Sequence, residues 1–294
     1  MIIGLIFSIF HSNYKNNSDL NKKHAILLLS SYGIDYLNSF LSQFKNDKRY
    51  DIYIHLDGKT KNDIDNGGII IKSNIKYRKH LYKSKRYSFE IVKAMYLLLS
   101  ESNKKDKYKY YHFFSDSCYL VKSLDEFYNF FNGSKSYFGF YKNKFSFHHN
   151  KSNKLYKGSQ WMSLHKAIVN EVLKRKYLFS QYEEEIKNGT LTIYKGCGAF
   201  DEHIIQNIII SDICEGNPKK YNIENKSIRY IRWHNCSKEH CPNYLNIDNV
   251  NEKEIIEIRK NYLIIRKINY KDSRARELLK KIGIFSNIRN IKLF

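Results

Sequence analysis

Apolar and polar positions alternate in blocks along the first half of the chain. The apolar run at 24–29 has the length of a buried strand, and apolar residues then recur at helical spacing over 34–44. The run at 50–57 is typical of a second strand that ends in a carboxylate, Asp57, and a polar turn is expected at 58–60. A strand, a helix and a strand in this order predict a parallel sheet whose ligands lie at the carboxyl ends of its strands.

The alternation continues to about position 133 and is less regular afterwards. A capping box at Ser123 and Glu126 predicts the start of one helix, which Asn132 and Gly133 end. Further strands are expected at 69–71, 110–114 and 262–268, and further helices at 88–100, 164–173, 201–209, 252–261 and 272–281. We find neither an internal repeat nor a linker rich in Gly, Pro or Ser, so one domain over 1–294 is predicted.

Composition excludes a disordered or collagen-like chain. Hydrophobic residues make up 42% and aromatic residues 15% of the chain, which contains only 13 Gly and 2 Pro. The net charge of +22 is strongly basic, but the lysines are spread over the whole sequence. The chain is also rich in Asn, Ile, Tyr and Phe. A nucleic-acid reader is expected to gather its basic residues on one element. We therefore expect no nucleic-acid partner and favour attraction to anionic lipid or phosphate-bearing substrates.

Signals for a membrane or an oxidising compartment are weak. The apolar stretch at 1–10 is about half as long as a bilayer-spanning helix, and it lacks a basic n-region and a small-residue cleavage site. We interpret it as a first strand, with a surface anchor as the alternative. Five cysteines, an odd number, do not suggest a disulfide framework. The predicted location is the cytoplasm, with peripheral contact at the inner face of the membrane left open.

Two clusters could carry chemistry. Asp201 and Glu202 follow a segment of small residues at 196–199, which lets a ligand approach the backbone closely. The pair is either a simple acidic preference at a helix start or a general base toward a hydroxyl. Arg266 and Lys267 are adjacent on a predicted strand, so they point to opposite faces. They are either a solvated strand end or a diphosphate site in which the lysine stabilises a leaving group.

Other chemistries lack their usual motifs. The cluster of His234, Cys236, His240 and Cys241 matches no common zinc-ligand spacing. The chain contains no GxxxxGK[ST], GxGxxG, GxSxG or HExxH motif. An Asp-x-Asp motif at 63–65 lies in a predicted polar turn instead of at a strand end, which disfavours a divalent metal. No cofactor and no metal are expected, and a transferase of this kind would use side-chain cations.

Several short motifs occur along the chain. Each is a weak indicator of a protein family by itself, but their joint order is more specific. They are AILL at 25–28, IYIHLDGK at 52–59, YHFFSD at 111–116, GSQW at 158–161, DE at 201–202, IRYIRW at 228–233, HCP at 240–242 and LIIRKI at 263–268. Over about residues 24–270 the chain resembles the core-2/I-branching β-1,6-N-acetylglucosaminyltransferases and the peptide O-xylosyltransferases, glycosyltransferase family 14, and their bacterial relatives. A basic C-terminal helix would follow at 272–294.

The resemblance implies an α/β, GT-A-like fold with a Rossmann-like, mostly parallel central sheet flanked by helices. It also implies an inverting, metal-independent mechanism and a UDP-sugar donor. Glu202 falls on the family's catalytic base and Lys267 on the cation that holds the donor diphosphate. The resemblance also places His55 and Asp57 beside the donor, and Trp161 and Trp233 in the sugar and acceptor cleft. We add Arg266 as a candidate for the donor, and Ser115, Asp116 and Asp201 as candidates for the sugar and the acceptor.

The chain departs from the family in two places. Residues 118–120 replace a segment that often carries an aspartate before a proline, and no second diphosphate-binding arginine matches near 244–245. Arg266 is the candidate replacement for that arginine. The animal enzymes' membrane stem and disulfides also have no counterpart, as suits a bacterial cytoplasmic enzyme.

The predicted function is transfer of a GlcNAc-like or xylose-like sugar to a glycan hydroxyl, in bacterial surface polysaccharide or lipooligosaccharide synthesis. The acceptor could be lipid-linked, because anionic membrane attracts a basic surface. The alternative from another class is a non-catalytic, basic carbohydrate-binding or envelope-associated protein in which Trp161, Trp233 and tyrosines stack on sugars. An RNA-binding protein is a third and weaker alternative.

Overall fold

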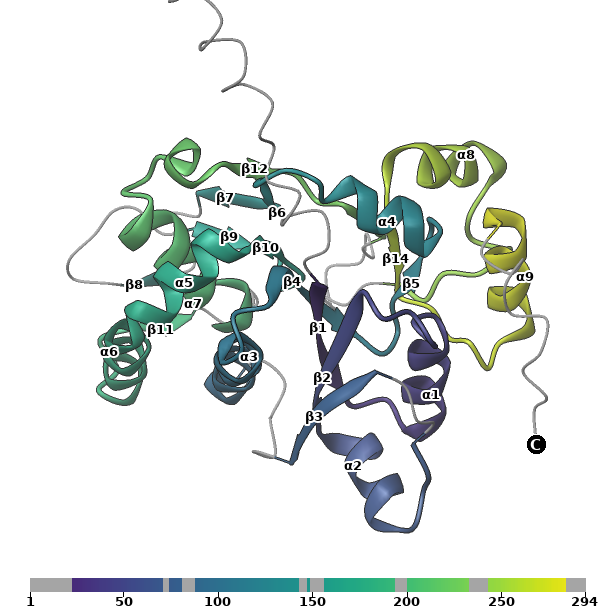
Figure 1. Cartoon of the computed structure of the whole chain (residues 1–294), viewed down its shortest axis with the longest axis horizontal. Coiled ribbons are helices and arrows are strands. Elements are labelled where there is room, and N and C mark those ends of the chain that lie inside the picture. Colours follow the sequence, from purple (N-terminus) through teal and green to yellow (C-terminus); the bar gives the residue numbers. More distant parts are fainter. Residues whose placement is uncertain are drawn as a thin grey trace, which may run out of the picture.

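A computed structural model describes residues 23–70, 74–80, 88–142, 147–148, 156–193, 200–232 and 243–283 (Figure 1). Several sequence-based expectations fall outside these residues. They are the strand or anchor at 1–10, the small-residue segment at 196–199, the His and Cys cluster at 234–241, Trp233, and the part of the C-terminal helix expected beyond 283. None of the described helices is both long and apolar enough to cross a bilayer.

A seven-stranded sheet in the order β12-β6-β10-β4-β1-β2-β3 forms the centre of the protein. Its strands are β1 (Lys23–Ser30), β2 (Tyr50–Leu56), β3 (Ile75–His80), β4 (Tyr108–Ser115), β6 (Ser136–Phe138), β10 (Ser163–His165) and β12 (Ile223–Asn225). All neighbouring pairs are parallel except the two that involve β10. The predicted fold class, an α/β arrangement with a mostly parallel central sheet flanked by helices, is confirmed.

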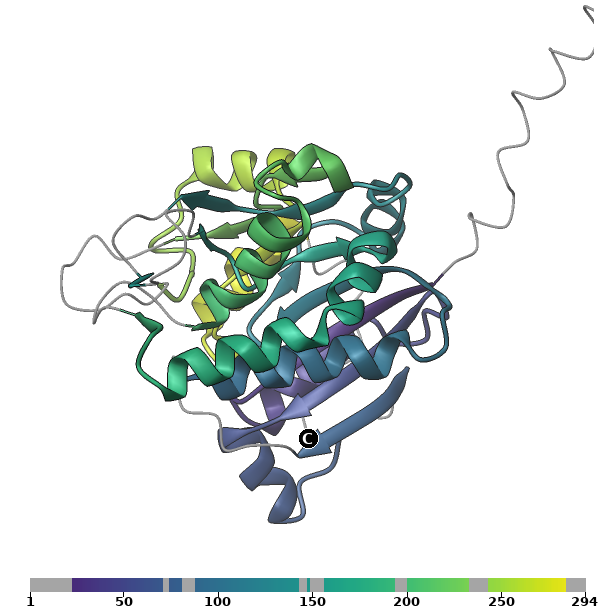
Figure 2. The ribbon, with the colours of Figure 1, turned by 90° about the vertical axis from the view of Figure 1, so that its left-hand side faces the viewer.

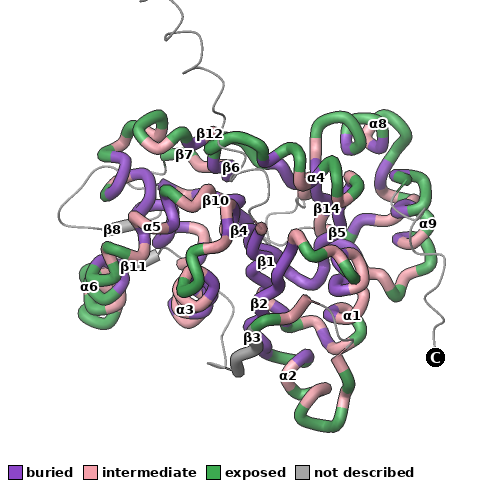
Figure 3. Tube along the Cα trace, in the orientation of Figure 1, coloured by how far each residue is buried: buried purple, intermediate pink, exposed green. Residues whose placement is uncertain are grey.

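Helices cover both faces of this sheet because successive side chains of a buried strand point to opposite sides. Ala25 and Leu27 of β1 belong to one apolar cluster, which also contains residues of α3 (Phe89–Asn103) and α5 (Lys166–Lys174). The alternate residues of β1 belong to a second cluster with α1 (Ile34–Ser42) and α4 (Leu124–Phe130). Figures 1 and 2 show the two groups of helices on opposite sides, and Figure 3 shows the central strands β1, β2 and β4 between them as mostly buried.

A smaller three-stranded sheet contains β5 (Tyr119–Leu120), the strand that follows β4 in the chain. Its order is β13 (Arg229–Ile231), β14 (Ile264–Arg266), β5, and β14 runs antiparallel to β5. The helices α8 (Glu252–Asn261) and α9 (Ser273–Ile282) enclose a third apolar cluster beside it. Because β5 follows β4 after only a short turn, the end of β14 is brought back toward the end of β4.

The remaining elements are short, apart from one helix. They are α2 (Gly58–Asp65), α6 (Lys176–Lys187), α7 (Ile204–Asn207), β7 (Phe140–Lys142) paired with β9 (Tyr156–Gly158), β8 (Phe147–His148) paired with β11 (Thr192–Ile193), the 3-10 helices η1 (Phe200–Glu202) and η3 (Pro218–Tyr221), and the π-helix η2 (Ile208–Ile213).

Most elements lie where the hydrophobic pattern predicts them, and four predictions are wrong. The Asp-x-Asp motif at 63–65, expected in a polar turn, forms the end of α2. The turn expected at 58–60 is the start of α2, which Asp57 caps. Residues 69 and 70 lie outside any strand, Ile69 is 82% exposed, and the edge strand begins at Ile75. Leu164 lies in β10 and not in a helix, because it pairs with β4. The capping box of Ser123 and the helix at 252–261 are confirmed.

Candidate active site

The candidate site residues gather at the carboxyl ends of the parallel strands. Asp57 follows β2 and Asp116 follows β4, while the turn after β1 lies between them in the sheet order. The segment after β14 reaches the same edge, because the Ile268 amide donates to the Ser117 carbonyl oxygen over 3.1 Å. The fold therefore brings Lys267 next to the end of β4, although the two elements are far apart in sequence.

Asp116 fixes the loop that follows β1. Its carboxylate is fully buried, and Oδ2 accepts hydrogen bonds from the Ser30 hydroxyl at 2.8 Å and from the amides of Ser31 and Tyr32 at 3.0 and 3.1 Å. Burial raises the pKa of Asp116 to about 6, against the lowering effect of these hydrogen bonds. This geometry makes Asp116 an anchor of the loop, and its predicted contact with a sugar stays a prediction.

Lys267 is held between two aromatic rings. Its ammonium nitrogen lies 5.0 Å from the centroid of the Tyr32 ring and 4.3 Å from that of the Tyr244 ring, and the residue is 7% exposed. The guanidinium of Arg266 lies 4.2 Å from the ring centroid of Trp161. The two adjacent cations thus contact different aromatic partners. Arg266 is the last residue of β14 and Lys267 lies just beyond it, so the predicted strand ends one residue before Lys267.

Neither cation is neutralised by an acidic neighbour. Within the described ranges, no ion pair or hydrogen bond to a carboxylate involves Arg266 or Lys267, and the buried Nε of Arg266 has no hydrogen-bond acceptor. A third cation, Arg229 of β13, lies beside them. Basic side chains gathered at one sheet edge favour the binding of an anion.

Arg229 is a site residue that the sequence reasoning did not single out. It is 3% exposed, its Nη2 donates to the Phe113 carbonyl oxygen over 2.6 Å, and its Nη1 donates to the Trp161 carbonyl oxygen. Burial lowers the pKa of Arg229 to about 10, and the positive charge of Arg266 acts in the same direction. Arg229 therefore ties the backbone of Trp161 to β4. The only sequence signal for it is an arginine next to apolar residues in a short strand.

Glu202 lies at the end of η1 and forms an ion pair with Lys157. The distance from its Oε2 to the ammonium nitrogen is 3.3 Å, and its side chain is 24% exposed. The preceding residue, Asp201, is buried. An amide donor from Gln206 reaches the carbonyl oxygens of both Asp201 and Ser159 at 3.0 Å. These bonds join the segment that carries Glu202 to the one that leads to Trp161.

Trp161 connects the acidic and the basic parts of the candidate site. Its amide donates to the Ser159 hydroxyl over 3.1 Å, and its indole ring lies under Arg266. Trp161 is 7% exposed, so most of its ring is covered by the protein. Glu202 and Arg266 are thereby linked through one continuous series of packed and hydrogen-bonded residues.

The other predicted residues lie at the same sheet edge. Asp57 accepts a hydrogen bond from the Gly58 amide over 2.7 Å and caps α2, and the buried His55 lies two residues earlier, in β2. The Ser115 hydroxyl is 3.0 Å from that of Ser117. In the part of the chain that the structure describes, no group of three or more His, Cys, Asp or Glu residues could hold a metal ion.

Comparison with known proteins identifies the family. The family model described as Branch, Core-2/I-Branching enzyme, matches residues 30–259, whereas no curated protein matches the chain. One similar solved structure is a glycosyltransferase involved in the glycosylation of the major capsid of PBCV-1, with 10% identity, 87% of this chain and 98% of that chain covered, and a TM-score of 0.41. Another is the apo form of the glycosyltransferase GlyE of Streptococcus pneumoniae TIGR4, with 11% identity and a TM-score of 0.43. This match covers 89% of this chain and 60% of that chain. Because the family model spans most of its length, the chain belongs to the Core-2/I-branching enzyme family of glycosyltransferases.

Proposed function

We propose that the chain is an inverting, metal-independent glycosyltransferase that moves a GlcNAc-like or xylose-like sugar from a UDP-sugar to a hydroxyl of a glycan. The observation that carries this proposal is the pair Arg266 and Lys267, which lies at the carboxyl edge of the sheet and has no carboxylate partner among the described residues. Ligands of open parallel sheets bind at this edge.

The charge at this edge suits a nucleoside diphosphate. When the bond between the sugar and the donor phosphate breaks, negative charge develops on the leaving diphosphate. Fixed cations that already face this position lower the barrier, because they need not reorganise as the charge appears. Lys267 would act as this cation, in the role that a bound metal ion has in other transferases.

Glu202 is the proposed general base. Its carboxylate is partly exposed beside Lys157, so it is accessible to an acceptor. It would take the proton from the acceptor hydroxyl while that oxygen forms its bond to the anomeric carbon on the face opposite the diphosphate. The bond to the diphosphate oxygen breaks with its electron pair, and the anomeric configuration inverts.

The acceptor and the cellular role are proposed from charge. A net charge of +22 attracts the chain to anionic lipid, where a lipid-linked glycan would be available. Synthesis of bacterial surface polysaccharide or lipooligosaccharide at the inner face of the membrane fits this attraction. Binding of the chain to vesicles with and without anionic lipid, at several salt concentrations, tests the membrane part of the proposal.

Thermal-shift screening with UDP-GlcNAc, UDP-xylose and UDP-Gal would first identify the donor. With that donor, Glu202→Gln should lower kcat by about 100- to 10,000-fold at unchanged folding, because removal of a general base costs this much. Glu224→Gln is a matched control, since Glu224 also pairs with a lysine, Lys135, at 3.0 Å. Near-normal transfer by folded Glu202→Gln would show that the base is another group.

A further inference from the structure

Two tyrosines, Tyr32 and Tyr244, form what we call the tyrosine cage around the ammonium group of Lys267. The ring centroids lie 5.0 and 4.3 Å from the nitrogen, within the range of a cation–π interaction. The two residues come from distant parts of the chain. Tyr32 follows β1, and Tyr244 precedes Leu245, whose amide donates to the Lys267 carbonyl oxygen over 2.8 Å.

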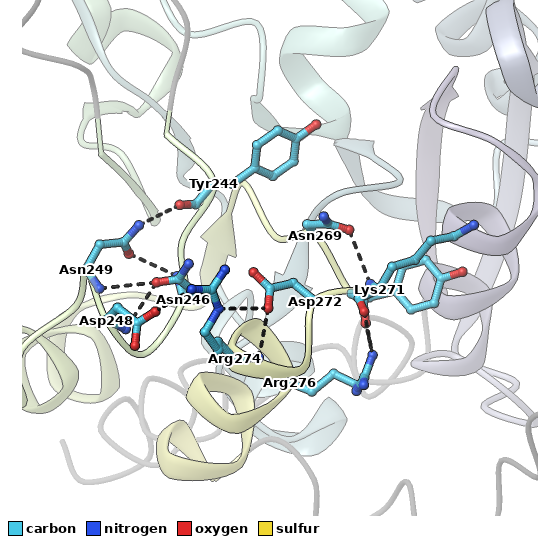
Figure 4. A network of polar contacts seen from close by, with 10 residues as sticks. Tyr244, Asn246, Asp248, Asn249, Asn269, Lys271, Asp272, Arg274 and Arg276 are labelled. Atoms are coloured by element: carbon cyan, nitrogen blue, oxygen red, sulfur yellow. Dashed lines mark hydrogen bonds and ion pairs between the residues drawn. The ribbon is translucent and has the colours of Figure 1, made fainter.

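The backbone of each cage residue is anchored by a polar side chain. The Tyr32 amide donates to the buried carboxylate of Asp116 over 3.1 Å. The Asn249 side-chain amide donates to the Tyr244 carbonyl oxygen over 2.8 Å, and Asn249 is in turn bonded to Asn246 (Figure 4). The backbones of both cage residues are therefore held by groups other than the Lys267 side chain.

Aromatic rings hold a cation in a different way from a carboxylate. A carboxylate partner would cancel the positive charge of Lys267 and compete with any incoming anion. The face of a tyrosine ring attracts the ammonium through its quadrupole and leaves the net charge unchanged. A cage of two rings can thus fix the nitrogen in space while it stays fully attractive to an anion.

We propose that Tyr32 and Tyr244 are positioning residues that hold the Lys267 ammonium ready for the diphosphate of the donor. This inference rests on the proposed function, since it takes Lys267 as the diphosphate-binding cation. Tyr244 is 41% exposed, so it forms the outer wall of the cage and can be replaced with little loss of core packing.

The test measures binding of UDP and of inorganic pyrophosphate to the full chain by isothermal titration calorimetry. Tyr244→Leu removes a ring face and should weaken both ligands by about 3- to 30-fold, whereas Tyr244→Phe keeps the ring and should stay within about twofold. The donor KM should rise in Tyr244→Leu with little change in kcat. Tyr177→Leu is the matched control, because Tyr177 is a 63% exposed tyrosine on α6.

A readout without ligand separates this inference from the proposed function. Ring currents should shift the ε-methylene resonance of Lys267 upfield in wild-type protein, and the shift should shrink in Tyr244→Leu. Unchanged UDP affinity in Tyr244→Leu, together with loss of affinity in Lys267→Met, would overturn the cage and leave the proposed function standing. Normal UDP affinity in Lys267→Met would instead overturn the diphosphate role of Lys267, while the resonance shift would still report on the cage.

Discussion

The guanidinium of Arg266 lies over the indole ring of Trp161, at 4.2 Å from the ring centroid. This contact joins the end of β14 to the segment that follows β9. Through Ser159 and Gln206 that segment is also joined to the residues around Glu202. One aromatic ring thus connects the proposed leaving-group site with the proposed base.

Replacement of Trp161 should therefore affect donor binding. Trp161→Leu removes the ring under Arg266 and should raise the donor KM by about 3- to 30-fold, the value of one partly desolvated cation–π contact. Trp161→Phe keeps a ring face and should have a smaller effect. Steady-state kinetics with the donor identified by thermal shift would measure both. An unchanged donor KM in folded Trp161→Leu would show that Arg266 does not need the ring.

Arg229 should contribute to stability through its two carbonyl partners. In Arg229→Met the carbonyl oxygens of Phe113 and Trp161 lose their donors inside the protein, which should lower the free energy of unfolding by about 1–3 kcal/mol. Urea denaturation measures this change, with the exposed Arg259→Met of α8 as a control. If the variant were as stable as wild type, the free-energy cost of burying the guanidinium charge would equal the stabilisation by its two hydrogen bonds.

Two buried histidines should make the fold sensitive to acid. Burial lowers the pKa of His24 from 6.5 to about 3 and also lowers that of His112, whose ring nitrogen lies 3.1 Å from His24. Between about pH 6.5 and 3 the unfolded chain then binds more protons at these sites than the folded one, so the free energy of unfolding falls as the pH falls. Asp116 acts in the opposite direction, because its raised pKa favours the folded state as the pH drops from about 6.

Urea denaturation at pH 7, 6 and 5 tests this balance. We expect the two histidines to outweigh the single aspartate, so the denaturation midpoint should fall with pH. His24→Phe keeps a ring that can stack on Tyr128, 4.7 Å away, and should flatten the pH dependence. A wild-type denaturation midpoint that does not change with pH would contradict this account. So would a midpoint of His24→Phe that changes with pH as steeply as that of wild type.

Chelation should leave sugar transfer almost unchanged if Lys267 and Arg266 supply the positive charge at the diphosphate. Transfer assayed with EDTA should stay within about twofold of the untreated rate, since no metal would be lost from the leaving-group site. A control reaction by a metal-dependent transferase under the same conditions shows that the chelator is effective. A strict requirement for Mn²⁺ would refute the side-chain-cation mechanism.

Local patterns were sufficient for the elements that bury a regular apolar face. The strand at 24–29 and the helix that begins at Ile34 carry their own signal, because each has the period of its element. The helix α2 has no such period. It forms because Asp57 caps it and because Thr60 accepts a hydrogen bond from the Gly33 amide over 2.8 Å. The contact of Thr60 depends on the turn after β1, which the local sequence of α2 does not show.

The candidate site was predictable in part, for a similar reason. Glu202, Arg266 and Lys267 could be proposed from residue type, their place in an element and the family resemblance. The partners that define their environment could not. Tyr32 and Tyr244 meet only because β14 returns to the end of β4, and nothing in the local sequence of either residue indicates this.

The central claim is that Glu202 and Lys267 serve one reaction from the same site. A crystal structure of Glu202→Gln with bound donor tests this claim most directly. We expect the diphosphate to contact the Lys267 ammonium, with the residue-202 side chain facing the anomeric carbon from the opposite side. A donor whose diphosphate lies away from Lys267, or whose anomeric carbon is out of reach of residue 202, would contradict the account.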